Sequence, residues 1–279
     1  MKAENTKPWP FSAAERSWML YDAANSAFVL VMITTVMPIF FKDIAAKGMD
    51  SAIATANWGY ANSAASLIIA FLAPVLGVFA DMEGNKKKFF SVFFLTGLGF
   101  TLLLTLVSQG DWIWCLVLFV IARVGWAGAN LFYDSFLVDV TEHNRMDRVS
   151  TFGYGWGYIG SVAPFIIVMA LIFLGRQPEQ DSIPELHTKT GFFVVALWWM
   201  VFTLPLLKNV QQNYFVEKDV NPVKAGFQRL VTTFREIRQY RQVFVFLLAY
   251  FFYIDGVSTI ITMATAYGRD VGLGITMLI

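Results

Sequence analysis

The chain has 279 residues, of which 57% are hydrophobic and 15% are charged, and its formal net charge is +1. A soluble domain is about one quarter charged, so this composition favours a protein embedded in a lipid bilayer over a soluble one. The balanced charge gives no indication of nucleic-acid binding. The one cysteine, Cys115, excludes a disulfide framework within the chain and a cysteine-based metal site, and we expect neither a metal nor another cofactor.

Seven apolar segments of the sequence are long enough, at roughly 20 residues, to cross a hydrocarbon core as helices. They lie at about 18–41, 52–80, 89–108, 112–140, 149–174, 191–207 and 243–268. Ser12 and Glu15, just before the first of them, have the spacing of a capping box that opens a helix. The fifth carries Gly153, Gly157 and Gly160 on one face, which predicts close packing against another helix.

The longest segment that does not span the membrane is 208–242, and it is strongly basic. Apolar side chains from Phe227 to Ile237 share one helical face, and arginines occupy much of the rest. We therefore expect an amphipathic helix on the cytoplasmic membrane surface, with a solvated linker helix as the alternative. When the N-terminus is placed in the cytoplasm, fifteen lysines and arginines fall in cytoplasmic segments and five in external ones, in agreement with the positive-inside rule.

Polar side chains lie within three of the predicted spans, where each costs free energy unless it faces a cavity or a partner. On a period of 3.6 residues, Arg123, Asn130 and Asp134 share one face of the fourth span. Similar stripes begin at Asp22 in the first span and at Asp255 in the seventh. The residues that we expect to bind a substrate or a coupling ion are Asp22, Asn25, Arg123, Asn130, Asp134, Asp255 and Ser258.

Two interpretations of these stripes stay open. Amides such as Asn25 and Asn130 could tie helices together, at about 0.6–2 kcal/mol for each hydrogen bond. Arg123 could form a structural ion pair with Asp22 or Asp134, or it could bind an anionic group of a substrate. A carboxylate that is removed from water binds protons more readily, so Asp22 or Asp255 could carry coupling protons.

The loop between the second and third spans carries a specific pattern. An apolar run stops at Asp81, Gly84 permits a tight turn, and three lysines follow before the next apolar run. The pattern G-x-x-x-D-x-x-G-x-[KR]-[KR], formed here by Gly77, Asp81, Gly84, Lys86 and Lys87, resembles the loop between spans two and three of major facilitator superfamily transporters. An ordinary positively charged loop is the alternative.

The resemblance to major facilitators implies an all-α integral membrane protein with the major facilitator fold. An N-terminal six-helix bundle would occupy 1–207, a basic cytoplasmic linker 208–242, and the first one or two helices of a second bundle 243–279. A complete facilitator has two six-helix bundles around a site near the membrane midplane, so the chain looks truncated. If it is complete as given, a partner would have to supply the missing second bundle. In this superfamily spans one, four, seven and ten line the cavity, and the three polar stripes fall on one, four and seven. The residue at the position of Asp81 contacts a helix end of the opposite bundle in one access state. Hydrogen bonds to local backbone and lysine side chains are the alternative for Asp81.

A narrower resemblance rests on the first, fifth and seventh spans. The motif Trp18-x-x-Tyr21-Asp22-x-Ala24-Asn25-Ser26-Ala27-Phe28 and the stretches 157–161 and 253–257 are similar to the vacuolar amino-acid effluxer family, which is autophagy-related in fungi and has bacterial members. The chain departs from that family at Ala23, where we would expect Trp. The resemblance implies efflux of a small solute, such as an amino acid, and for a bacterial member a place in the inner (plasma) membrane.

We therefore expect a secondary transporter that moves a small-molecule substrate across the lipid bilayer by alternating access, with protons as the coupling ion. We do not expect an enzyme, because the spans carry no Ser/His, paired-Asp or His-rich signature, nor a primary pump, because the sequence has no ATP-binding loop. The alternative is a truncated membrane scaffold that transports nothing, or a decayed gene product.

Overall fold

The computed structural model describes residues 11–80, 82–177, 181–215, 228, 232, 235–237 and 239–278. Within these ranges the chain is folded into helices, and seven of them are long and apolar enough to cross a membrane. Their bounds are Ala13–Ala45, Ser51–Val78, Asn85–Leu106, Trp112–Ser135, His143–Gly175, Glu185–Asn209 and Arg241–Asp270. The predicted all-α fold with seven spans is confirmed, and the chain is a multi-pass integral membrane protein.

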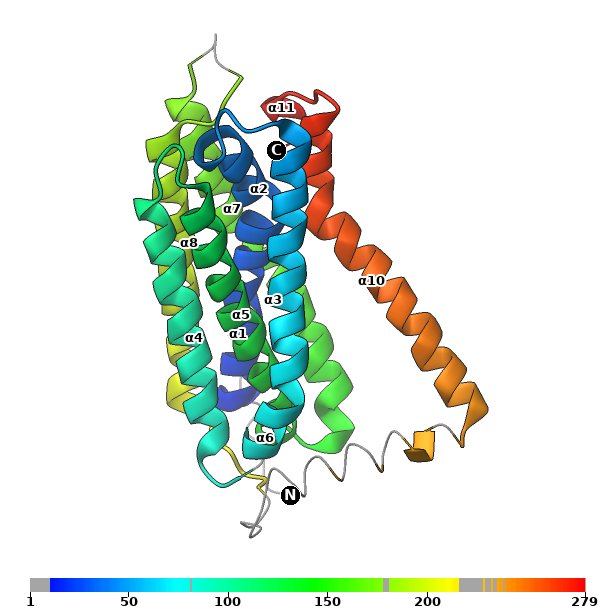
Figure 1. Ribbon diagram of the computed structural model, residues 1–279. Coiled ribbons are helices and arrows are strands. Elements are labelled where there is room, and N and C mark those ends of the chain that lie inside the picture. Colours follow the sequence, from blue (N-terminus) through cyan, green and yellow to red (C-terminus); the bar gives the residue numbers. More distant parts are fainter. Residues whose placement is uncertain are drawn as a thin grey trace.

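Figure 1 shows a bundle of helices with one helix leaning away from it. The bundle contains α1 (Ala13–Phe28), α2 (Val36–Phe40), α3 (Ser51–Ala80), α4 (Asn85–Leu103), α5 (Trp112–Ser135), α6 (Leu137–Val140), α7 (Met146–Gly175) and α8 (Glu185–Asn209). The helix that leans away is α10 (Arg241–Asp270), and α11 (Ile275–Leu278) follows it. Wider helical turns at Val29–Thr35 and Phe41–Ala45 join α1 to α2 and extend α2, so the first span is nearly continuous.

The start of α1 forms as the sequence predicts. The Ser12 hydroxyl accepts a hydrogen bond of 3.1 Å from the Glu15 backbone N–H, and Glu15 Oε2 accepts one of 2.6 Å from the Ser12 N–H. This capping box satisfies two donors that the first turn of a helix leaves without partners. Glu15 also accepts hydrogen bonds from Thr141 (2.7 Å) and Arg145 (3.1 Å), which tie the start of α1 to the segment between α6 and α7.

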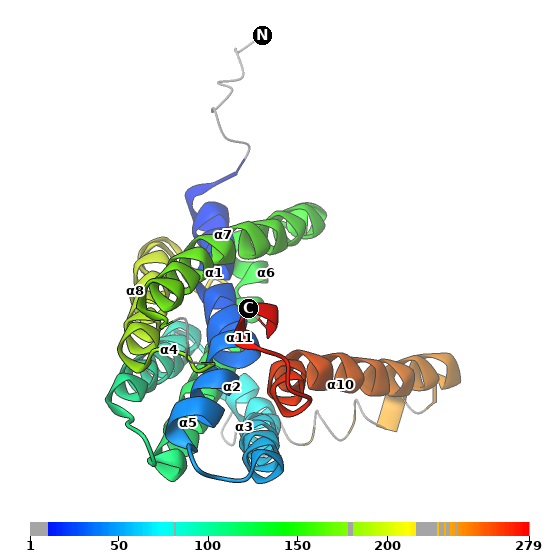
Figure 2. The same ribbon diagram turned by 90° about the horizontal axis from the view of Figure 1, so that it is seen from above.

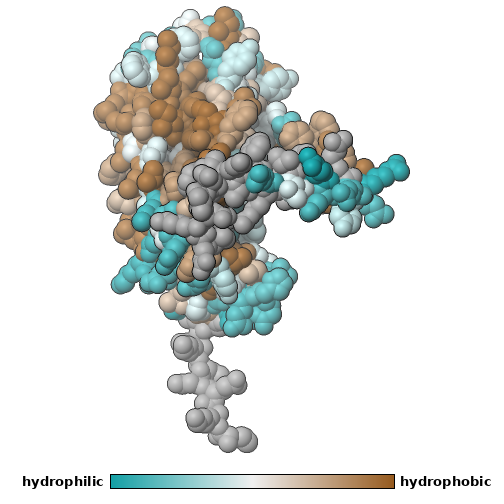
Figure 3. All heavy atoms as spheres, turned by 60° about the horizontal axis from the view of Figure 1, so that its bottom comes forward, coloured by the Kyte–Doolittle hydropathy of each residue, from teal (hydrophilic) through white to brown (hydrophobic). Residues whose placement is uncertain are grey.

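The first span forms the centre of the bundle. In Figure 2, which views the bundle from above, α1 lies between α7 and α8 on one side and α5 on the other. Its large side chains Tyr21, Phe28 and Phe40 are fully buried, whereas the outer faces of other spans expose many Leu, Ile and Phe side chains. Figure 3 shows this exposed apolar surface in brown, mainly in the upper left of the view, with hydrophilic side chains in teal lower down and at the right. An apolar outer surface of this extent suits contact with lipid.

α10 contacts the bundle only through its C-terminal part. Its buried residues are Thr262, Thr265, Ala266 and Gly268, and Figures 1 and 2 show the rest of the helix diverging from the bundle. The Trp58 indole N–H on α3 donates a hydrogen bond of 2.9 Å to the Thr262 carbonyl. One end of α10 is therefore held against the bundle while the other end stands apart from it.

Two sequence predictions fall outside the described residues. One is the role of Asp81, and the other is most of the amphipathic surface helix within 208–242, including Phe227 and Arg229. The tight turn after α3 is described and confirmed, because Gly84 has a φ of 69°, which a residue with a side chain rarely adopts.

Candidate functional site

A polar cavity of about 350 Å³ lies between α1, α5 and α7. Four of the residues predicted to bind a substrate or coupling ion line it, and these are Asp22, Asn25, Asn130 and Asp134. Asp22 is buried, with 9% of its surface exposed, whereas Asp134 is exposed. The structure thus brings together the polar stripes of the first and fourth spans, which are separated by about 100 residues in the sequence.

A chain of amide hydrogen bonds joins the two stripes. Asn25 lies three residues after Asp22, on the same helical face, and its Nδ2 donates a hydrogen bond of 3.2 Å to Asp22 Oδ1. Asn25 Oδ1 accepts a hydrogen bond of 3.4 Å from Asn130 Nδ2 on α5. The two amides therefore do tie helices together, and they also hold the Asp22 carboxylate at the cavity wall.

Glycines allow α7 to approach the cavity from the third side. A Cβ atom on Gly157 would lie 2.7 Å from Asp22 Oδ2, and one on Gly153 would lie 2.7 Å from the Trp18 ring. A Cβ atom on Gly160 would overlap Ala23. The close helix packing that the sequence predicts for these glycines is confirmed, and its partner is α1.

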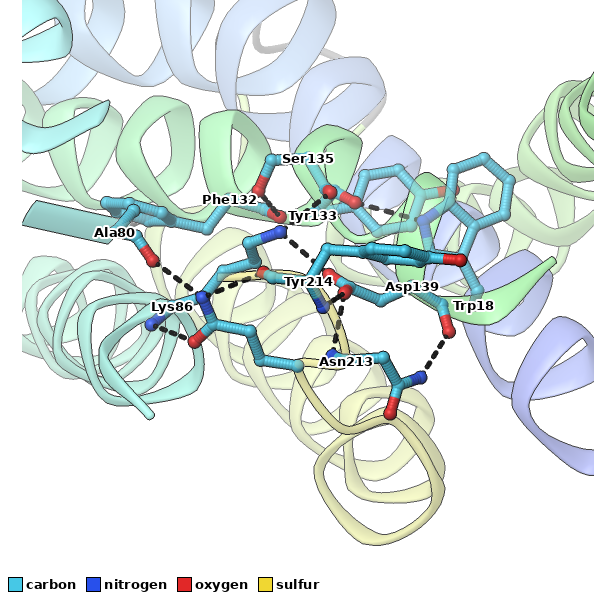
Figure 4. A network of polar contacts seen from close by, with 10 residues as sticks. Trp18, Ala80, Lys86, Phe132, Tyr133, Ser135, Asp139, Asn213 and Tyr214 are labelled. Carbon is cyan, nitrogen blue, oxygen red and sulfur yellow. Dashed lines mark hydrogen bonds and ion pairs between the residues drawn. The ribbon is translucent and has the colours of Figure 1, made fainter. Parts of the chain in front are cut away.

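Three aromatic side chains complete the cavity wall, and sequence reasoning did not select them. They are Trp18, Tyr133 and Tyr154. The Trp18 ring stacks on the Tyr133 ring with centroids 4.5 Å apart, and its indole N–H donates a hydrogen bond of 2.9 Å to the Tyr133 carbonyl, as Figure 4 shows. Trp18 lies four residues before Asp22, and Tyr133 lies three residues after Asn130, so helical spacing alone could have indicated both.

The other predicted residues do not line this cavity. Arg123 lies nearer the middle of α5, and its Nη1 is buried without a hydrogen-bond partner among the described residues. It forms no ion pair with Asp22 or Asp134, so the predicted structural pairing does not occur. Asp255 and Ser258 lie on the exposed part of α10. A second cavity of about 350 Å³ lies between α3 and α10 and includes Thr259 and Thr262 from the polar stripe of the seventh span.

The loop motif after α3 contacts the segment that follows α8. Lys86 is buried and forms an ion pair of 2.7 Å with Asp139, next to α5 (Figure 4). The same carboxylate accepts hydrogen bonds of 2.8 and 2.9 Å from the backbone N–H groups of Asn213 and Tyr214. Lys87 Nζ donates one of 2.9 Å to the Val210 carbonyl. The lysines of the motif thus bind backbone and carboxylate groups, and the motif's Gly77 is half-buried on α3.

An ionic cluster joins α10 to the bundle at the opposite end from this loop. Arg269 donates hydrogen bonds of 3.2 and 3.1 Å to the two carboxylate oxygens of Asp43, and it also pairs with Asp181 at 2.6 Å. Lys42 pairs with Asp270, to which the Thr55 hydroxyl donates a hydrogen bond of 2.6 Å. The hydrogen bond from Arg269 lowers the pKa of Asp181 below its usual range.

The family described as "Vacuole effluxer Atg22 like" matches residues 13–278. A Bacillus subtilis (strain 168) protein named as an uncharacterized MFS-type transporter, YxiO, is 46% identical over 270 residues, which is 96% of this chain and 63% of that protein. The autophagy-related protein 22-1 of Penicillium rubens is 26% identical over 132 residues, 44% of this chain and 21% of that protein.

These matches support a transporter. A further relative, from Aquifex aeolicus (strain VF5), is 25% identical over 91% of this chain and 57% of its own length, so the chain spans less than two thirds of the curated relatives it matches. No solved structure matches it. The relatives named as transporters point away from an enzyme, and the alternative of a scaffold that transports nothing draws no support from them.

Proposed function

Because the chain belongs to the Atg22-like vacuole effluxer family, we propose that it is part of a secondary active transporter that exports a small solute by alternating access. The observation that supports this proposal best is the cavity between α1, α5 and α7, where Asp22, Asn25, Asn130 and Asp134 converge inside a membrane bundle. Polar groups that meet within spans usually serve a solute pathway or a proton relay.

Amino acids are the first solutes to test, because the resemblance of the first span to vacuolar amino-acid effluxers implies them. Protons are the proposed coupling ion, with Asp22 as their carrier. This carboxylate is buried, and among the described side chains only the Asn25 amide donates a hydrogen bond to it.

We place the N-terminus in the cytoplasm and the protein in a bacterial plasma membrane. The division into a bundle at 1–207, a linker at 208–242 and a second bundle beginning at 243 belongs to the same proposal.

Alternating access requires two bundles to rock around a site near the midplane. The arrangement of α10, held at one end and diverging at the other, is compatible with closure at the end that carries Arg269 and Asp270. On the proposed orientation this closed end is external, and the cavity near Asp22 and Asp134 faces the cytoplasm.

The test is counterflow of radiolabelled amino acids into proteoliposomes that contain the protein purified from its native membrane, with every helix bundle that it has there. We expect accumulation of at least one amino acid, a response to an imposed pH gradient, and loss of both in Asp22→Asn. Glu142→Gln is the matched control, because Glu142 is an exposed acid outside the cavity near the same end of the bundle. If no labelled solute accumulates in liposomes that hold correctly folded protein, the transporter proposal is wrong; flux that ignores the pH gradient contradicts proton coupling alone.

A further inference from the structure

We propose that the cavity between α1, α5 and α7 binds the ammonium group of its solute, with Asp22 and Asp134 as counter-charges, and therefore favours cationic amines over carboxylates. This inference rests on the proposed transport function and specifies the chemical class of the substrate. It differs from the sequence-based expectation, in which Arg123 offers a binding group for an anion.

The charge of the cavity wall is the first argument. Its lining contains the two carboxylates of Asp22 and Asp134, and no lysine, arginine or histidine occurs among the described residues that line it. Arg123 precedes Asn130 by seven residues, which places its backbone about 10 Å farther along α5. Neither aspartate forms an ion pair within the part of the chain that the structure describes. Two carboxylates that line one cavity without a cation from the protein attract a positively charged ligand.

The hydrogen-bonding groups of the wall give a second, independent argument. Most nitrogen donors on the lining side chains are already used: Trp18 Nε1 on the Tyr133 carbonyl, Asn25 Nδ2 on Asp22, and Asn130 Nδ2, through one of its two hydrogens, on Asn25. Asn130 Oδ1, in contrast, is buried without a hydrogen-bond partner among the described residues. The wall therefore offers this oxygen as an acceptor for a ligand N–H, and none of its nitrogen donors carries a positive charge for an anion.

Tyr133 offers the ligand a hydroxyl, which can accept a hydrogen bond from an ammonium group or donate one to a carboxylate and so does not discriminate between them. Its side chain lines the cavity and is only 4% exposed, yet its hydroxyl has no hydrogen-bond partner among the described residues. A buried polar group without a partner costs free energy, and a bound ligand can remove that cost. The rings of Trp18, Tyr133 and Tyr154 also present aromatic surface, which attracts an ammonium group through cation–π interactions. A volume of about 350 Å³ is at the small end for ligand pockets, so the solute would be small.

Three solutes of similar shape differ in their charged groups, so they distinguish binding through the ammonium group from binding through the carboxylate. Leucine carries both an ammonium and a carboxylate group, isopentylamine carries only the ammonium group, and 4-methylpentanoate carries only the carboxylate. Binding of each to the purified protein in detergent can be measured from the concentration dependence of its thermal stabilisation. We expect isopentylamine to bind most tightly, with a Kd about tenfold or more below that of 4-methylpentanoate.

Variants assign this binding to the two aspartates. Asp22→Asn and Asp134→Asn should each raise the Kd for isopentylamine about tenfold, whereas Glu142→Gln should leave it unchanged. Asp134 is exposed, so its variant remains informative even if Asp22→Asn fails to fold. The inference is overturned if 4-methylpentanoate binds as tightly as the amine, or if both asparagine variants bind the amine as the unmodified protein does.

Flux measurements distinguish failure of this inference from failure of the transporter proposal. If proteoliposomes accumulate labelled leucine but the protein shows no preference for the amine, only the ligand class is wrong. If the amine binds in a manner that depends on Asp22 and Asp134 but no solute crosses the membrane, the ligand class stands and the transport function is wrong.

Discussion

Thr265 on α10 donates a hydrogen bond of 2.6 Å to the backbone carbonyl of Thr34 in the first span. Thr34 lies four residues before Pro38, and proline has no N–H with which to bond the carbonyl one helical turn earlier. The proline therefore leaves an acceptor available within the membrane, and a residue 231 positions away in the sequence satisfies it. A local feature of one helix thus provides a point of attachment for another.

Replacing Thr265 by valine should weaken the attachment of α10. The substitution keeps the shape of the side chain but removes the donor, so we expect a loss of about 0.6 kcal/mol, the average for a hydrogen bond between membrane helices. The free energy of unfolding in mixed micelles measures it. Thr259→Val is the matched control, because Thr259 is exposed and its hydroxyl donates no hydrogen bond among the described contacts. Equal stability of the two variants would contradict the expected role.

The ion pair between Lys86 and Asp139 should contribute strongly to stability. Both side chains are buried, so Lys86→Met leaves a carboxylate without its counter-charge and should cost about 3–5 kcal/mol of unfolding free energy. Lys88→Met, two positions along the same helix at an exposed site, should change stability little. Unfolding curves of both variants test this. A similar small effect in both would show that the backbone bonds of Asn213 and Tyr214 suffice to hold Asp139.

Gly160 and Gly155 lie on the same helix, α7, but only Gly160 packs closely against another helix, so alanine substitutions at the two positions can be compared to test helix packing. A Cβ atom at Gly160 would overlap Ala23 of α1, whereas none of the neighbouring atoms lies within 4 Å of a Cβ atom at Gly155. We expect Gly160→Ala to lose roughly 1–3 kcal/mol of stability through overpacking. Gly155→Ala should be neutral or stabilising by up to about 1 kcal/mol, because alanine favours the helix. Thermal unfolding of the two variants measures the difference, and equal destabilisation would argue against close contact at Gly160.

Asp181 should make the attachment of α10 sensitive to acid. Its pKa is lower in the folded protein than in the unfolded chain, because Arg269 donates a hydrogen bond to it. Such a group stabilises the fold above its unfolded pKa, and this contribution disappears as the pH falls through the folded value. We therefore expect Asp181→Asn to lower the Tm at about pH 6, and we expect this difference to shrink as the pH falls below the unfolded pKa of an aspartate, about 3.9. A Tm difference that does not depend on pH would mean that the charge of Asp181 is not involved.

The amino-acid sequence by itself determined the spans and several of their local features. The length of an apolar segment, the spacing of Ser12 and Glu15, and the shared face of Gly153, Gly157 and Gly160 are properties of neighbouring residues on one helix. Helical periodicity and the need to satisfy backbone groups in lipid decide them without reference to any other helix. The family could be identified from the sequence for the same reason, since its motifs are short and local.

Only the tertiary structure decided which polar residues meet. Periodicity placed Arg123 on the same stripe as Asn130 and Asp134, but the structure brings only the latter two into the cavity with Asp22. It also pairs Lys86 with Asp139, which lies 53 positions away, and places Asp255 on an exposed part of α10. Contacts between helices depend on the rotation and depth of each helix in the bundle. Those are set by packing, such as the glycine contacts of α7 with α1 and the stacking of Trp18 on Tyr133, which no single span encodes.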